Sequence, residues 1–213
     1  MDNKIQTISV NPLSPQGQDQ YQQTGNDNVM IPNYGTVNIN VQQGWIPATP
    51  TGSFYIPSVI NREYYNLFVV GIEEFDKHYF KIMRKRSLCE YMTDETKKRF
   101  DALTPEMIAE IKTLPSLFMA ENKEYGKASE EQRVIYGFVS DVKIYEEDVK
   151  IYYCGYTKDI KQQRLNGLLE ELGLKGTDVF NELNRTHWAI KRVDLIQELL
   201  EANIQIPVFN MQR

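Results

Sequence analysis

The two histidines are the first residues to consider for chemistry, because the sequence contains no others. His187 stands beside Trp188 in FNELNRTHWAIKRVDL, residues 180–195, where a helical pattern changes to an alternating one. A histidine near carboxylates can act as a general acid or base. At a helix end, however, carbonyls without partners need a donor. The stretch therefore predicts a structural His187, with Trp188 in the core and Asn184 as the partner of its indole N–H.

His78 follows three carboxylates in a predicted strand connection, Glu73, Glu74 and Asp76. A hydrolase or nuclease with an unfamiliar site around His187 or His78 is therefore one hypothesis. A solvated turn explains the same cluster more simply. A metal centre needs three or more suitable ligands, and neither histidine has a second one at helical or strand spacing. Phosphate-binding glycine loops and nucleophile elbows are absent from the sequence. We expect no metal and no cofactor.

The stretch VIYGFVSDVKIYEEDVKIYYCGY predicts the clearest element, a hairpin that turns at residues 146–147. Counting from this turn places Asp141 opposite Tyr152. Asp141 and the later Asp148-Val-Lys triplet superficially match the spaced carboxylates of restriction-type nucleases. In this register, Asp141 lies roughly 13 Å along the strand from the level of Asp148, too far for the two to share a metal ion. The charged side chains of the hairpin instead predict a solvated face.

Aromatic residues crowd the same hairpin: Tyr136, Phe138, Tyr145, Tyr152, Tyr153 and Tyr156. Rings on a sheet, beside basic side chains, can stack the bases of single-stranded nucleic acid. Alternation sends about half of these rings into the core, and the acidic residues 146–148 would repel phosphate at the tip. A single-stranded nucleic-acid binder is therefore a further hypothesis. Its predicted contacts are Tyr145, Tyr152, Lys158, Lys161 and Arg164.

Periodicity and capping residues place the other elements. Strands are predicted at 63–71, 78–84, 187–193 and 204–209, the second being the hairpin partner of the first, and 114–122 is either strand or turn. Helices are predicted at 94–103, 106–114, 159–173, about 177–185 and 195–203. Thr93 and Asp194 are expected helix caps, and Pro105 suits a first helical position. The pattern predicts an α+β fold: antiparallel β-hairpins forming a curled sheet with helices packed on it, and a mixed helix–strand C-terminal part.

The first fifty residues differ in character, because Asn and Gln dominate them and charge is sparse. We predict a polar tail at 1–52 and a single α+β body at 53–213. Within the tail, apolar residues alternate across a Pro-Asn-Tyr-Gly turn, which predicts a short strand or hairpin at 29–41, with a structureless linker as the alternative. An uncharged strand of this kind is prone to pair with another chain or copy. The predicted interaction residues are Val29, Ile31, Tyr34, Val37, Ile39 and Val41.

Charge and cysteine content narrow the class of protein. The net charge is −5 and the isoelectric point is near 5.2, which argues against a general nucleic-acid binder. Cys89 and Cys154 have no metal-binding or disulfide-framework spacing, so a reducing cytoplasm is expected. The sequence contains no apolar run of signal-peptide or membrane-spanning length, so a protein without a membrane partner is expected.

Four pieces, VMIPNYGTVNINV, YYNLFVVG, FVSDVKIYEEDVKIYY and FNELNRTHWAIKRVDL, together resemble small bacterial accessory modules of conflict and antiphage systems. The resemblance implies that the Asn-rich strand joins a sensor or adaptor part to an effector part, and it transfers no functional residue. The leading hypothesis is therefore a non-enzymatic protein–protein interaction or adaptor module. It would self-associate or bind a protein partner, as an accessory component of bacterial antiviral defence.

Overall fold

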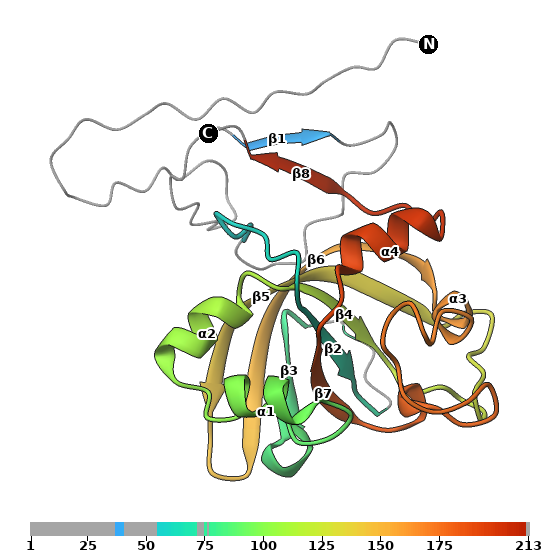
Figure 1. Ribbon diagram of the computed structural model, residues 1–213, viewed down its shortest axis with the longest axis horizontal. Coiled ribbons are helices and arrows are strands. Elements are labelled where there is room, and N and C mark those ends of the chain that lie inside the picture. The colour runs from blue at the N-terminus through green and yellow to red at the C-terminus, as the bar shows by residue number, and fades with distance from the viewer. Residues whose placement is uncertain (1–36, 41–54, 72–74, 76, 212–213) are drawn as a thin grey trace, which may run out of the picture.

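The computed structural model describes residues 37–40, 55–71, 75 and 77–211 (Figure 1). These residues form an α+β fold with one open six-stranded sheet and a separate two-stranded ribbon. The predicted fold class is therefore confirmed. The helices of the described residues are all too short or too polar to cross a membrane.

Strands and helices mix along the whole of the described chain. The strands are β1 (Val37–Asn40), β2 (Tyr65–Val69), β3 (Tyr79–Met83), β4 (Pro115–Met119), β5 (Arg133–Ile144), β6 (Asp148–Lys161), β7 (His187–Lys191) and β8 (Val208–Met211). The helices are α1 (Asp94–Phe100), α2 (Pro105–Ile111), α3 (Gln162–Asn166) and α4 (Leu195–Glu201), with short 3₁₀ turns η1 (Arg84–Arg86) and η2 (Glu182–Asn184).

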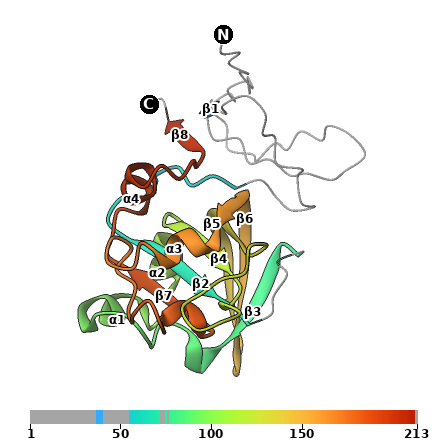
Figure 2. The same ribbon diagram turned by 90° about the vertical axis from the view of Figure 1, so that its right-hand side faces the viewer.

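The six-stranded sheet has the order β3-β6-β5-β4-β2-β7. β2 is parallel to β4, whereas the other neighbours are antiparallel. The predicted hairpin between 63–71 and 78–84 is wrong, because β3 pairs with β6 at the edge of the sheet (Figure 2). Burial fits this arrangement: every residue of β2 is buried, because both faces of this strand are covered, whereas β3 alternates between buried and exposed residues, because one of its faces is uncovered.

Each face of the sheet carries its own hydrophobic core. One core packs Phe100 of α1 and Ile111 of α2 against the sheet, and the other packs Leu165 of α3 and Leu199 of α4. Trp188 lies at the centre of the first core and is fully buried, as the sequence predicts. Its indole N–H donates to Asn66 Oδ1 at 3.2 Å, however, so the expected partner Asn184 is wrong. Asn66 lies on the adjacent strand β2, which local sequence distance cannot reveal.

Local capping signals are confirmed. Thr93 Oγ1 accepts from Thr96 N at the start of α1, and Asp194 Oδ1 accepts from Gln197 N at the start of α4. Pro105 opens α2, as its missing N–H allows. The undecided stretch 114–122 contains the buried central strand β4.

Two predicted helices are wrong. The stretch 159–173 begins as the end of β6, which pairs through Lys161 with Arg133, and α3 then spans five residues. The stretch 177–185 contains a turn and then η2. In both places an amphipathic local pattern is overridden by pairing and packing with distant segments. Gly173 adopts a left-handed conformation, at φ 63°, in a turn that follows α3.

Candidate functional site

The long hairpin of β5 and β6 presents a bare sheet face near its turn, with β3 alongside. Figure 1 shows the hairpin turn at the bottom of the view. Val142, Val149 and Ile151 point into the core, so the alternate residues lie on the outer side. A bulge between Val139 and Asp141 shifts the alternation of β5, which places Asp141 and Lys143 on this outer face.

Three lysines form a row across this face. Lys143 of β5 pairs directly with Lys150 of β6, and Lys150 pairs directly with Lys81 of β3. Directly opposed like charges destabilise a sheet. Asp148 lies 3.4 Å from Lys81 Nζ and offsets part of one charge. The row is therefore a concentration of positive charge that folding by itself does not favour.

Tyrosine rings border the lysine row on both sides. Lys150 Nζ lies 3.6 Å from the ring centre of Tyr79 and 4.8 Å from that of Tyr152. On the turn side, Lys81 Nζ lies 5.5 Å from the ring centre of Tyr145, which is 49% exposed. We call the six residues the tyrosine–lysine face: Tyr79, Lys81, Lys143, Tyr145, Lys150 and Tyr152.

The lysines change the acidity of the central tyrosine. A hydrogen bond from Lys150 lowers the pKa of Tyr152, and the charge of Lys143 lowers it further. The same hydrogen bond with Tyr152 raises the pKa of Lys150, so this lysine stays charged. The face therefore keeps the positive charge of Lys150 at neutral pH, beside the half-exposed ring of Tyr145.

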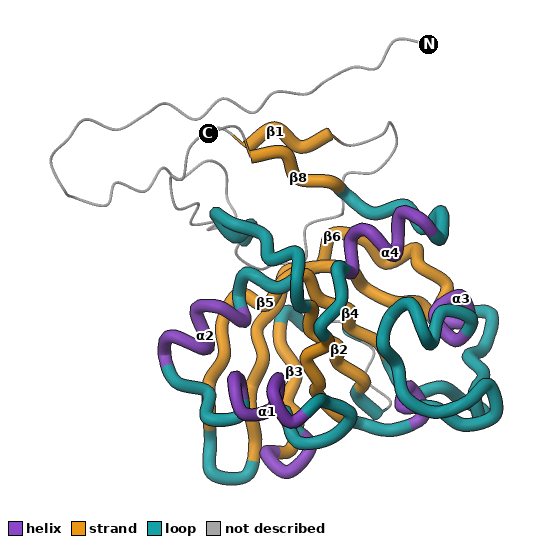
Figure 3. The backbone as a smooth tube through the Cα atoms, in the orientation of Figure 1, coloured by secondary structure: helices purple, strands orange, loops and turns teal. Residues whose placement is uncertain are grey.

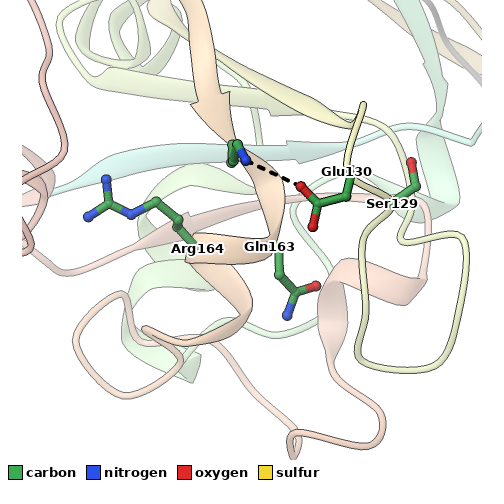
Figure 4. A pocket seen from close by; sticks show the side chains of 5 residues that line it. Ser129, Glu130, Gln163 and Arg164 are labelled. Carbon is green, nitrogen blue, oxygen red and sulfur yellow. Dashed lines mark hydrogen bonds and ion pairs between the residues drawn. The ribbon is translucent and has the colours of Figure 1, made fainter.

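Two of the predicted nucleic-acid contacts, Tyr145 and Tyr152, belong to this face. The predicted contacts Lys161 and Arg164 do not, because Lys161 lies nine residues beyond Tyr152 in the sequence, roughly 30 Å along β6. They line a shallow pocket with Ser129, Glu130 and Gln163 (Figure 4). Lys161 is paired there with Glu130 at 3.2 Å. The side chain of Lys158 lies outside the described residues.

Arg164 is also engaged elsewhere. It donates to the carbonyl oxygens of Ala202 and Asn203 after α4. This pocket therefore offers a ligand little unpaired charge.

Sequence reasoning missed Tyr79 and Lys81 as members of the face. Their alternation within HYFKIMR does place them on one side of a strand. The sequence assigned this strand to the wrong partner, so nothing connected it with the hairpin. The predicted facing of Asp141 and Tyr152 is confirmed, which keeps Asp141 four positions from the level of Asp148.

His187 lies in a closed cluster rather than at an accessible site. Its side chain is fully buried, and Nδ1 lies 2.7 Å from the carbonyl oxygen of Arg185, the residue that follows η2. Nε2 lies 3.4 Å from a carboxylate oxygen of Glu182, and no donor in the described residues reaches it. Glu182 also accepts from Lys191 Nζ at 2.6 and 2.8 Å. The cluster ties η2 to β7, and a substrate cannot reach His187 in this conformation.

Burial dominates the electrostatics of this cluster. It lowers the pKa of Lys191, and the attraction of Glu182 opposes part of that shift. Burial, with a smaller contribution from Glu182, raises the pKa of Tyr65 well above its usual range.

His78, the other catalytic candidate, is exposed beside the tyrosine–lysine face. Its ring contacts those of Tyr79 and Tyr152, at centroid distances of 5.4 and 5.9 Å. Glu73, Glu74 and Asp76 lie outside the described residues. Among the residues that the structure does describe, no three His, Cys, Asp or Glu side chains gather closely enough to hold a metal ion.

The predicted interaction strand is partly described. Val37 and Ile39 belong to β1, whereas Val29, Ile31, Tyr34 and Val41 lie outside the described residues. β1 pairs antiparallel with β8, near the other end of the same chain, with Ile39 opposite Phe209. Figure 3 shows this ribbon beyond α4, apart from the six-stranded sheet.

No protein-family model, curated protein or solved structure matches the chain. Function must therefore be argued from the geometry of the α+β fold and its exposed aromatic and basic face.

Proposed function

We propose that the protein binds single-stranded nucleic acid on the tyrosine–lysine face. The observation that carries this proposal is the row of three directly opposed lysines bordered by tyrosine rings. Phosphates would relieve the repulsion within the row, and bases would stack on the rings. A net charge of −5 disfavours binding over the whole surface, but a local cationic row acts at contact distance.

Fluorescence anisotropy with a labelled oligothymidylate of about 16 nucleotides tests the proposal. We expect the wild type to bind at low salt, and Tyr152→Ala to weaken binding by about 1–3 kcal/mol, because one stacking surface is lost. The matched control is Tyr125→Ala, since Tyr125 is 74% exposed and contacts Phe180 away from this face. Absence of wild-type binding, or equal losses in the two variants, would contradict the proposal.

The ribbon of β1 and β8 favours a second function, self-association within an adaptor. In the described part of the chain, β1 and β8 pair only with each other, and no other described strand covers their outer edges. A two-stranded ribbon is marginally stable in water, and an edge without charged residues or proline invites pairing. The segments VNIN and VFNM contain neither. An accessory role in bacterial antiviral defence follows from the sequence resemblance, and a cytoplasmic location suits Cys89 and Cys154, which are not joined in a disulfide.

Light scattering on the full chain tests self-association. We expect a mass above that of one chain, which falls in Asn38→Pro because proline removes an N–H from β1. Asn38→Thr is the control, because threonine is compatible with a strand. A monomeric wild type, or an Asn38→Pro variant of unchanged mass, would rule out assembly through the ribbon.

A further inference from the structure

The direction of the lysine row determines how a ligand can lie on the tyrosine–lysine face. Lys143, Lys150 and Lys81 lie on three neighbouring strands, in the order β5, β6, β3. Neighbouring strands are about 4.8 Å apart, so the row extends about 10 Å perpendicular to the strands. The positive charge therefore runs across the hairpin and not along it.

A nucleic-acid chain could instead run along β6, but carboxylates lie at both ends of that path. On the turn side, Asp148 is the next outward residue of β6 after Lys150, and Glu146 and Glu147 follow in the exposed turn. On the other side, Asp141 faces Tyr152. A phosphodiester chain that followed the strand would pass these charges and be repelled. A chain that crosses the strands meets lysines at each step.

The tyrosines lie where the bases of a crossing chain would be. Tyr145 is on the turn side of the row, where its backbone pairs with Asp148. Tyr79 and Tyr152 are partners in the row beyond the lysines, with ring centroids 5.8 Å apart. Bases that turn to either side of a phosphate path along the row would therefore each meet a ring. Bases held in Watson–Crick pairs cannot turn away from their own strand in this manner.

We propose, resting on the nucleic-acid function proposed above, that an unpaired polynucleotide crosses β5, β6 and β3 with its phosphates over the lysine row. Its bases lie on Tyr145 on one side and on Tyr79 and Tyr152 on the other. The ligand class is a short unpaired stretch of DNA or RNA, recognised through charge and stacking and not through base sequence. Duplex nucleic acid is excluded from this path.

The salt dependence of binding counts the phosphates and so tests the path. For single strands, log K falls with log salt with a slope of about −0.7 per neutralised phosphate, so three lysines predict a slope of about −2. The probe is the labelled oligothymidylate. We expect Lys81→Gln and Lys143→Gln each to reduce the slope by about 0.7. Lys98→Gln is the control, because Lys98 is exposed on α1 away from the face.

A new charge in the turn separates the two paths. Glu147→Lys leaves the slope unchanged if the chain crosses the strands, but steepens it by about 0.7 if the chain follows β6. A steeper slope in Glu147→Lys, an unchanged slope in both row variants, or equal affinity for a duplex competitor would overturn the crossing path while binding itself stands. Failure of the wild type to bind any oligonucleotide would instead remove the proposed function. Thermal melts of each variant confirm that it is folded.

Discussion

Replacing Lys191 with methionine removes a cation that contacts the fully buried carboxylate of Glu182 at 2.6 and 2.8 Å. The carboxylate keeps its bond from Lys175 N, at 3.0 Å. The carbonyls of Tyr91 and Gly173 lose a donor as well. Breaking one side of a buried ion pair leaves an uncompensated charge and costs about 3–5 kcal/mol. Because domains are stable by only about 5–15 kcal/mol, we expect Lys191→Met to lose a large share of the total.

A second substitution should recover part of this loss. In Glu182→Gln the charge disappears, the remaining amide oxygen can still accept from Lys175 N, and the amide can donate to the unpartnered Nε2 of His187. We expect the double variant with Lys191→Met to be more stable than Lys191→Met alone by about 2 kcal/mol or more. A double-mutant cycle on urea unfolding, with the midpoint and the m-value measured for each variant, gives the coupling energy.

The neighbouring residue provides a matched control. Arg192→Met removes a cation that pairs with Glu63, but both side chains are more than half exposed, so we expect a loss within about 1 kcal/mol. A loss in Lys191→Met no larger than that in Arg192→Met would refute the reasoning. So would a cycle in which the effects of Lys191→Met and Glu182→Gln simply add.

Two further predictions concern stability. Gly137→Ala should lower the free energy of unfolding by about 3 kcal/mol or more, the upper end of the usual cost of overpacking. The reason is that an added Cβ would lie 2.0 Å from a carbonyl oxygen of the paired strand. Gly71→Ala, whose Cβ would find its nearest neighbour at 3.7 Å, should be tolerated, and similar melting temperatures for the two would contradict this. Burial raises the pKa of three tyrosines, Tyr65, Tyr136 and Tyr156. Since the unfolded chain releases these protons above about pH 10 and the folded chain retains them, stability should be complete below that pH and fall above it, by up to about 1.4 kcal/mol per pH unit for each tyrosine. Urea midpoints across alkaline pH check this, and a flat profile would contradict it.

Local sequence determined the hairpin and the helix caps. The two alternating runs around residues 146–147 predict both the strands and their register, because side chains alternate with a period of two and the turn sets the count. The pair of Asp141 with Tyr152 is therefore as predicted. The caps at Thr93 and Asp194 are short-range for the same reason: the hydrogen bond spans three residues.

Only the tertiary structure decided which distant strand lies beside the hairpin. Lys81 and Asp148, 67 positions apart in the sequence, interact because β3 pairs with β6 and not with β2. The pairing partner of β3 depends on which strands are covered on both faces. That is fixed only when all strands and helices pack together. The sequence alone therefore identifies Tyr145 and Tyr152 as candidate nucleic-acid contacts. The complete lysine row and the third ring, Tyr79, exist only once the chain has folded.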